Sequence, residues 1–370
     1  MLRDAHDRPV GDHWLHHGTD VETVWEGPVP HLTPTDRFYV RNHTEAPEID
    51  PAGWRLLVSG DGVIRDVTYS LADLRAFTSA TYERALECTG NGRSLFETQQ
   101  GTHRPGTQWR HGAIGVARWS GVPLSSLLHH AGLRPEAVCV TPVGLDASYV
   151  VDGVDHGRVR RPLPLTKALD DVMVALDMND APLPRDHGFP ARLVVPGWVG
   201  IASIKWLGEL RVTTRVEDSP WNTLWYRMHG KGWRGRAAEL DRMPVKSVLD
   251  VAVVDGVAGQ VPVVGRPAVL RGRAWSGDAA IAAVEVSADG GRTWRPATLT
   301  GPNETSSWTS WEAIWTPERN GTHELRVRAT DTDGRTQPDE AADNEDGYFF
   351  AAVVRYPVDV AAPEGAPVGA

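Results

Sequence analysis

The chain changes character near residue 244, and this change limits how it can fold. Before that point short apolar runs alternate with helical periodicity, as in Leu124, Leu127 and Leu128. After it, strand-like runs recur at roughly ten-residue spacing with turn residues between them. A length of 370 residues is enough for two domains. We therefore predict an α+β fold, in which a mixed α/β domain precedes an all-β sandwich.

Composition sets the expected boundaries. The first residues are polar and rich in Pro and His, which predicts an extended arm, and the last ones are small residues and Pro, which predicts disorder. The histidines of the arm have no fixed spacing, so they are more typical of a solvated segment than of a metal site. The expected parts are an arm at 1–36, an α/β domain at 37–240, a sandwich at 241–358 and a disordered tail at 359–370.

Net charge and cysteine content exclude several classes of protein. A formal charge of -10 argues against binding to nucleic acid or to an anionic membrane surface. No apolar run approaches the roughly 18 residues of a membrane span. The chain has only two cysteines, which does not support a disulfide framework. Residues 1–11 show no secretory leader, so we expect a cytoplasmic protein, or a periplasmic one if a leader has been removed.

Cys88 has the most informative surroundings in the chain. It ends an apolar run, a Gly-Asn-Gly turn follows, and Arg93 comes five residues after the thiol. Flexible backbone at such an edge lets a large group approach closely. A nearby guanidinium lowers the pKa of a thiol and attracts anions. Cys88 could therefore be an activated nucleophile or a metal ligand, whereas Cys139 lies in an apolar strand and is expected to be inert.

Further segments accompany Cys88 in a characteristic order. They are residues 38–43, 109–115, 117–124, 178–192, 195–200 and 205–207. Together with the sandwich that follows, this pattern resembles the sulfite oxidase family of molybdenum-cofactor enzymes over about residues 36 to 357. The resemblance implies a molybdopterin-binding catalytic domain and an immunoglobulin-like dimerisation domain, hence a homodimer. The haem-binding segment of the animal members is not present.

The resemblance also implies a set of cofactor-binding residues. In this family one protein thiolate joins the pterin sulfurs on molybdenum, and that role falls to Cys88 because a soft sulfur suits the metal. Arg192 and Lys205 border apolar runs, where an unpaired charge is costly, which favours an anionic partner such as the pterin phosphate. The full expected set is Tyr39, Val40, Arg41, Asn42, His43, Cys88, Asp146, His187, Arg192, Ser203, Ile204 and Lys205.

The implied reaction is oxygen-atom transfer, most directly the oxidation of sulfite to sulfate. The electrons would pass to an external acceptor such as cytochrome c or oxygen. The expected catalytic residues are Cys88, Arg41, Arg93 and Trp109. The two guanidinium groups can each hold two oxygens of a small oxyanion. Trp109 is expected to form a wall of the pocket.

Two positions depart from the family pattern. A further substrate arginine is replaced by Ala202, and the active-site tyrosine falls near Val159. Tyr149 or His156 could take the place of that tyrosine. The same cofactor and fold could instead serve a reduced-sulfur dehydrogenase component, or a reductase of nitrate or an S-oxide. A non-catalytic binding protein is a more distant interpretation, and it predicts no molybdenum in the purified protein.

Overall fold

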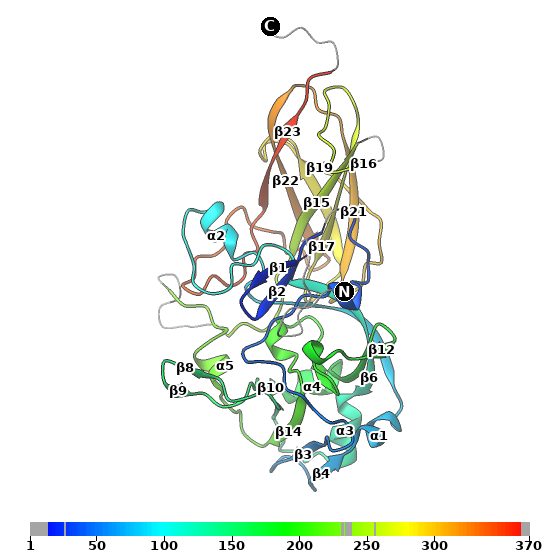
Figure 1. Ribbon diagram of the computed structural model, residues 1–370, viewed down its shortest axis with the longest axis vertical. Coiled ribbons are helices and arrows are strands. Elements are labelled where there is room, and N and C mark those ends of the chain that lie inside the picture. The colour runs from blue at the N-terminus through cyan, green and yellow to red at the C-terminus, as the bar shows by residue number, and fades with distance from the viewer. Residues whose placement is uncertain (1–13, 26, 231–232, 234–238, 255–256, 364–370) are drawn as a thin grey trace.

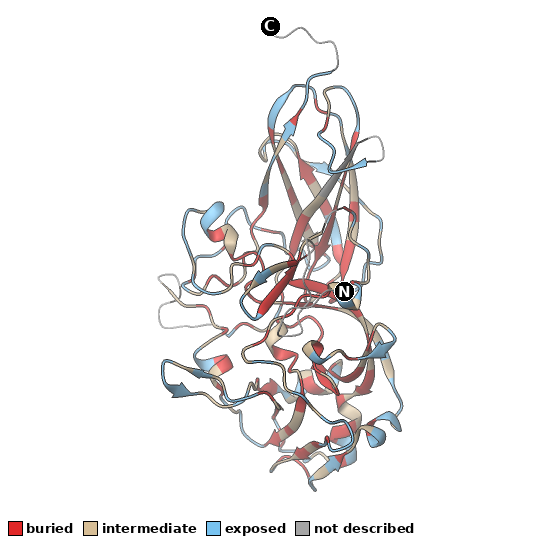
Figure 2. Cartoon of the chain, in the orientation of Figure 1, coloured by how far each residue is buried: buried red, intermediate tan, exposed pale blue. Residues whose placement is uncertain are grey.

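The computed structural model describes residues 14–25, 27–230, 233, 239–254 and 257–363. Two parts lie one above the other along the long axis, with the sandwich at the top and the mixed α/β part at the bottom (Figure 1). Buried residues run through the sheets of both parts and across the level where the parts meet (Figure 2). The predicted α+β fold is thereby confirmed.

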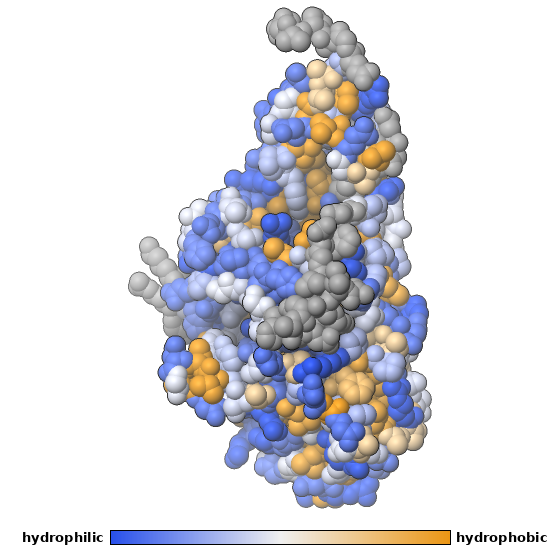
Figure 3. Space-filling view, in the orientation of Figure 1, coloured by the Kyte–Doolittle hydropathy of each residue, from blue (hydrophilic) through white to orange (hydrophobic). Residues whose placement is uncertain are grey.

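The α/β part contains two five-stranded sheets. The first has the order β10 (Leu163–Pro164), β7 (Cys139–Gly144), β14 (Leu207–Thr213), β3 (Leu56–Ser59) and β4 (Val67–Tyr69), in which β14 and β3 are parallel. The second is antiparallel, with β12 (Ala181–Pro182), β11 (Met173–Met178), β6 (Ile114–Pro123) and β5 (Ala80–Glu87), and β13 (Arg192–Val194) also pairs with β11. A small hairpin of β8 (Val150–Val151) and β9 (Val154–Asp155) exposes apolar side chains (Figure 3).

Short helices connect these strands. They are α1 (Leu71–Arg75), α2 (Ser94–Thr98), α3 (Leu124–Ala131), α4 (Leu165–Asp170) and α5 (Pro220–Thr223), with 3-10 turns at Thr35–Arg37, Arg185–His187 and Gly200–Ala202. The predicted leucine stripe of α3 is fully buried in the core of the first sheet, and each such side chain contributes roughly 1.5–3 kcal/mol. No helix in the described part of the chain is long and apolar enough to cross a membrane.

The sandwich consists of two antiparallel sheets. One has the order β16 (Val257–Ala258), β15 (Lys246–Val254), β17 (Ala268–Trp275), β21 (Trp308–Trp315) and β20 (Thr298–Leu299). The other has the order β19 (Arg295–Pro296), β18 (Ile281–Ser287), β22 (Gly321–Asp331) and β23 (Val354–Val360). The prediction that the chain is disordered from residue 359 onward is wrong for Asp359 and Val360. Both residues pair with β22, and Val360 is buried. Residues 364–370 of the predicted tail lie outside the described residues.

The N-terminal segment is not an extended arm where the structure describes it. β1 (Trp14–His17) and β2 (Asp20–Thr23) form a hairpin at the junction of the two parts (Figure 1). Its buried Glu22 accepts hydrogen bonds from the backbone N–H groups of Gly112 (2.7 Å) and Arg110 (2.9 Å). The prediction of a solvated arm failed because Glu22 of β2 accepts hydrogen bonds from backbone N–H groups in the loop before β6, which is far away in the sequence. Residues 1–13 lie outside the described residues.

A buried ionic contact joins the sandwich to the strand that precedes Cys88. Glu87, the last residue of β5, accepts hydrogen bonds from Lys246 Nζ (2.8 Å), Trp275 Nε1 (3.0 Å) and Asn91 Nδ2 (2.9 Å). Lys246 also donates to the carbonyl oxygen of Asn91 (3.1 Å). Glu87 and Lys246 are both almost completely buried. Two residues of the second domain therefore fix the start of the Cys88 loop.

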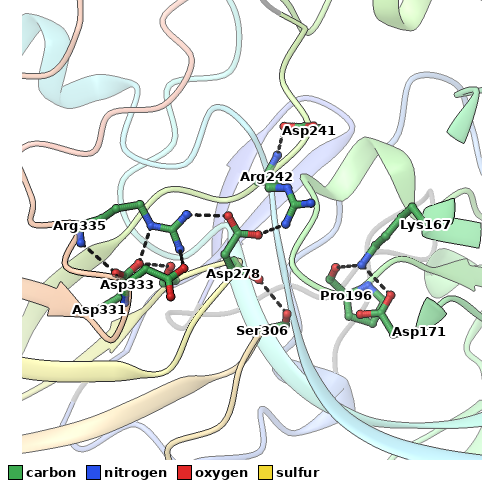
Figure 4. Close-up of polar contacts among 12 residues, drawn as sticks. Lys167, Asp171, Pro196, Asp241, Arg242, Asp278, Ser306, Asp331, Asp333 and Arg335 are labelled. Carbon is green, nitrogen blue, oxygen red and sulfur yellow. Dashed lines mark hydrogen bonds and ion pairs between the residues drawn. The ribbon is translucent and has the colours of Figure 1, made fainter. Parts of the chain in front are cut away.

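A more exposed ionic network lies along the same junction (Figure 4). Arg242, from the connector between β14 and β15, pairs with Asp278 of the sandwich. Asp278 also accepts from Arg335 (2.7 Å), which in turn contacts Asp331 (2.8 Å) and Asp333 (3.0 Å). Exposed pairs of this kind contribute about 0–1 kcal/mol each. The network therefore orients the connector, whereas loss of one partner from the buried Glu87 contact should destabilise the protein more.

Lys246→Met is predicted to destabilise the protein by about 3–5 kcal/mol, because it leaves the Glu87 carboxylate buried without its cation. Urea unfolding measures the loss. Arg75→Met is the matched control, since it removes a cation from an exposed pair with Asp177 and should cost less than about 1 kcal/mol. Equal effects of the two substitutions would contradict the assigned role of the buried contact.

Candidate active site

An inner cleft in the α/β part gathers side chains from segments far apart in the sequence. Its walls include nearly all of the predicted cofactor-binding residues, namely Tyr39, Arg41, Asn42, His43, Cys88, Asp146, His187, Arg192, Ser203, Ile204 and Lys205. They come from the segment after the first 3-10 turn, the end of β5, the loop after β7, and the segments on either side of β13. The fold thus brings the predicted set to one place.

Val40 is the exception among these residues. Its backbone pairs with that of Val21 through two hydrogen bonds of 2.9 Å. Its side chain packs with Trp14 and Val21 and does not line the inner cleft. Because successive side chains of an extended segment point to opposite sides, Tyr39 and Arg41 face the cleft while Val40 faces the hairpin. The structure therefore makes Val40 a packing residue and removes its side chain from the expected set.

Cys88 lies at the point where β5 ends. Its backbone N–H donates to the carbonyl oxygen of Ala113 (2.9 Å), and its own carbonyl oxygen accepts from Asn91 (2.9 Å), so the thiol is held by the main chain. Burial raises the pKa of the Cys88 thiol, against the opposing effect of Arg41 and Arg93. Desolvation therefore outweighs the lowering that the sequence suggested. Cys139 is buried in β7 and does not line the inner cleft.

One end of the inner cleft contains two cations without a carboxylate partner among the described residues. Arg192 is 5% exposed, and it donates to the carbonyl oxygens of His187 and Ser203, both at 3.0 Å. Lys205 Nζ donates to the carbonyl oxygen of Asp186 (2.8 Å). Burial lowers the pKa of Arg192 to about 10 and that of Lys205 to about 7. A buried guanidinium and a half-buried ammonium that make no ion pair with a carboxylate among the described residues favour an anionic ligand such as a phosphate.

A buried acceptor lies on another wall of the inner cleft. Asp146 is 2% exposed, and its Oδ1 atom has no hydrogen-bond partner in the described part of the chain. Its carboxylate accepts from backbone N–H groups, including a long bond to Oδ2 from Val159 (3.4 Å). Burial raises the pKa of this carboxyl to about 6. An orphaned acceptor, two unpaired cations and a free thiol fit a ligand with N–H donors, a phosphate and a soft metal.

An outer cavity of about 260 Å³ adjoins the cleft at Cys88. It is lined by Arg41, Cys88, Gly90, Arg93, Pro105, Gly106, Thr107, Trp109, Tyr226, Asp346 and Tyr348. All four predicted catalytic residues are in this set. The indole N–H of Trp109 is buried and has no partner among the described residues. The cavity therefore offers several donors within a small volume.

Arg93 is held in the outer cavity by backbone carbonyl groups. It donates to the carbonyl oxygens of Asp346 (3.0 Å) and Thr107 (2.8 Å), and its guanidinium lies 5.4 Å from the ring centre of Tyr348. It is 7% exposed and has no carboxylate partner among the residues described. Gly90 leaves room for this position of Arg93, because a Cβ atom there would lie 2.7 Å from the guanidinium carbon and would displace it. Arg93 is thus a fixed cation available to an anion.

Arg41 depends on a residue that the sequence reasoning missed. Asp20, in β2, lies 3.5 Å from the Arg41 Nε atom and also accepts from Asn42 N (3.1 Å) and Thr107 Oγ1 (2.7 Å). Burial opposes the charge of Arg41, but Asp20 raises the pKa of Arg41 above its ordinary value. The alternation of Asp20, Val21 and Glu22 was a strand signal, but nothing in it placed Asp20 beside the site.

The two residues that depart from the family pattern, Val159 and Ala202, lie in different surroundings. Val159 lines the inner cleft, whereas Ala202 is fully buried in the hydrophobic core and lines neither cavity. Tyr149 and His156 contact the ring of Trp225 and also line neither cavity. Instead Tyr226, from the connector, lines both cavities. Tryptophans flank Tyr226 in the sequence, but no pattern there marked the tyrosine as a site residue.

Comparison with known proteins gives two matching families. Residues 43–221 match the oxidoreductase molybdopterin binding domain, and residues 238–359 match the Mo-co oxidoreductase dimerisation domain. Human mitochondrial sulfite oxidase is 35% identical over 329 residues, which are 84% of this chain and 58% of that protein. Sulfite oxidase of Gallus gallus is 37% identical over 333 residues, which are 84% of this chain and 69% of that protein.

More distant relatives carry other names. An NADH nitrate reductase of Solanum lycopersicum is 26% identical over 408 aligned positions, which cover 100% of this chain and 44% of that protein. The crystal structure of the sulfane dehydrogenase SoxCD from Paracoccus pantotrophus matches with a TM-score of 0.80 and 29% identity, covering 97% of this chain and 92% of that one. The chain spans a little over half the length of the mammalian relatives, 58% in the human protein.

Lys205→Met is predicted to flatten the pH dependence of stability in the ligand-free protein. The pKa of Lys205 is about 7 when folded and roughly 10.4 when unfolded. Between these values the unfolded chain binds the extra proton, so stability rises with pH by up to about 1.4 kcal/mol per unit. Below pH 7 both states are protonated and the penalty stays constant.

Urea unfolding from pH 6 to 9.5 compares the variant with the wild type. The variant should lack the rise between pH 7 and 9.5. Saturating inorganic phosphate should shrink the difference, because a bound anion favours the charged lysine. Parallel profiles for the two proteins would contradict the assigned burial of Lys205.

Proposed function

Because this chain belongs to the sulfite oxidase family of molybdenum-cofactor enzymes, we propose that it is a molybdopterin-dependent oxidoreductase that converts sulfite to sulfate. The observation that carries the proposal is the position of Cys88. Its thiol borders both the inner cleft, which has unpaired cations and an unpaired acceptor, and the outer cavity, which has two guanidinium groups. The Cys88 thiol therefore lies between a cleft that can hold a large anionic cofactor and a cavity that can hold a small anion.

The residues of the inner cleft would hold the cofactor. When bound, molybdopterin supplies two-electron oxygen-atom transfer at its molybdenum. Cys88 offers the protein thiolate. Arg192 and Lys205 would bind the phosphate through charge-assisted hydrogen bonds. Asp146 would accept from an N–H group of the ring, which satisfies the Oδ1 atom that has no partner now.

The residues of the outer cavity would hold the substrate. Arg41 and Arg93 converge on it with charges that are fixed by Asp20 and by backbone carbonyl groups. Each charged hydrogen bond to an oxyanion contributes roughly 1.5–3 kcal/mol. Trp109 closes one wall and excludes water, which strengthens these interactions. Electrons would leave to an external acceptor, cytochrome c or oxygen, and two chains would pair through the sandwich.

A second candidate keeps the cofactor and the fold but changes the substrate to a reduced-sulfur compound, nitrate or an S-oxide. Asp346 favours nitrate or a neutral S-oxide among these, because a carboxylate lines the same outer cavity and repels a doubly charged anion. Specificity constants of the molybdenum-loaded protein for sulfite, nitrate, thiosulfate and dimethyl sulfoxide separate the candidates. A higher value for any of the last three would overturn sulfite as the substrate.

Cys88→Ser is predicted to lower sulfite oxidation by at least about 100-fold, equal to roughly 2.7 kcal/mol, while circular dichroism stays unchanged. The reason is that a hydroxyl is a poor ligand for a metal with sulfur co-ligands. Cys139→Ser is the matched control, because Cys139 is buried in β7 away from both cavities, and it should keep full activity per molybdenum. Full activity in the Cys88 variant would sink the thiolate assignment.

Asp346→Asn is predicted to lower the KM for sulfite about 3- to 10-fold, because it removes a negative charge from the wall of the outer cavity. The backbone carbonyl that holds Arg93 is retained. Steady-state kinetics at low ionic strength measure the change, and added salt should weaken it. An increase in KM would show that the carboxylate assists sulfite binding, against the proposed charge arrangement.

A further inference from the structure

Tyr226 occupies a position shared with only two other residues of the described chain. The residues that line both the inner cleft and the outer cavity are Arg41, Cys88 and Tyr226. Two of these are the proposed metal ligand and a proposed anion-binding cation. We propose that Tyr226 is a substrate-binding residue, whose hydroxyl donates a hydrogen bond to the oxyanion beside Cys88. This inference rests on the proposed function, because it needs a small oxyanion in the outer cavity.

The hydroxyl proton of Tyr226 is available to a ligand. Its Oη atom lies 3.3 Å from His43 Nε2, and the indole N–H of Trp221 donates to that same nitrogen at 3.3 Å. Because an indole nitrogen can only donate, His43 Nε2 must be the acceptor, and the proton of the contact with Tyr226 belongs to the tyrosine. Two donors therefore share one neutral lone pair at long distance. A charged oxygen in the cavity is a stronger acceptor, so the hydroxyl can turn to it.

The protonation states of this pair agree with that arrangement. Burial lowers the pKa of His43 well below its usual range, and Arg41 and Lys205 add to the effect. Burial likewise raises the pKa of Tyr226. The histidine therefore stays neutral and the tyrosine stays protonated near neutral pH. A protonated hydroxyl is what a bound oxyanion requires.

The fold holds the Tyr226 side chain in one place. Its backbone is in the left-handed region with φ +56°, a conformation that costs a non-glycine residue about 1–3 kcal/mol and that persists only where the surroundings enforce it. Its carbonyl oxygen accepts from Leu240 N (2.9 Å), and its ring stacks on Tyr348 at 5.5 Å between centres and 13° between planes. The fully buried Arg161 donates to the carbonyl oxygens of Trp221 and Leu240.

Other hydroxyl groups near the site do not meet the same requirement. Tyr39 lines the inner cleft but not the outer cavity. Tyr348 lines the outer cavity but not the inner cleft, so it does not border both sides of Cys88. Tyr149 packs on Trp225 and lines neither. Tyr226 thus supplies, from the connector, the hydroxyl that Val159 cannot.

The test is Tyr226→Phe in the molybdenum-loaded full chain, with Tyr69→Phe as the matched control. Tyr69 is also a buried tyrosine whose hydroxyl pairs with a histidine, His130 Nδ1 at 2.7 Å, but it lies in the core of the first sheet. The Phe ring should keep the stack on Tyr348, so the variant should load normally. Calorimetry of sulfate binding is the readout, because it does not depend on turnover. The dissociation constant should rise roughly 10-fold in Tyr226→Phe and stay within 2-fold in Tyr69→Phe.

Three results would overturn the inference. They are an unchanged sulfate affinity in Tyr226→Phe, an equal loss in Tyr69→Phe, and a fall in molybdenum content that accounts for the whole effect. The proposed function has its own outcome, because a wild type that binds nitrate but not sulfate refutes sulfite oxidation alone. The Tyr226 comparison is then made with nitrate, where the same 10-fold loss is expected. A wild type that binds neither anion refutes both proposals.

Discussion

The structure depends on one buried carboxylate, that of Glu87. Lys246 and Trp275 reach it from the sandwich, and Asn91 reaches it from the turn that follows Cys88. A charge buried this deeply is tolerated only because its partners are complete. The residue before the proposed metal ligand is therefore fixed by the second domain. The second domain therefore does more than contribute Asp346 and Tyr348 to the wall of the outer cavity, because it also sets the position of the thiol.

Three cations of the two cavities follow an opposite rule, because they make no ion pair with a carboxylate among the described residues, whereas Arg41 is paired with Asp20. Arg192 and Lys205 in the cleft and Arg93 in the outer cavity are buried or nearly so, and backbone carbonyl groups hold them in place of carboxylates. Such groups are costly unless a ligand completes them. The contrast with Glu87 separates structure from function in this molecule. Satisfied buried charges hold the domains together, and unsatisfied ones mark where anions bind.

Local sequence was enough to predict the α+β fold, and the family resemblance of the Cys88 turn and the cation-bearing segments gave most walls of the cleft. Three features lay beyond it. Val40 turns away from the cleft because a strand alternates, and its partner Val21 lies in a hairpin that composition made look like a solvated arm. Asp20 reaches Arg41 through that same long-range pairing. Tyr226 reaches Cys88 because the connector folds back across the site, which no periodicity in one segment can predict.

The central claim is that the Cys88 thiolate binds molybdenum at the boundary of the two cavities. Its most direct test is molybdenum-edge X-ray absorption on loaded protein in which selenocysteine replaces Cys88 and Cys139 is changed to serine. The account predicts a selenium atom bonded to molybdenum, since the substituted side chain keeps its place at the end of β5. A spectrum with only lighter neighbours around the metal, in protein that still carries molybdenum, would contradict it.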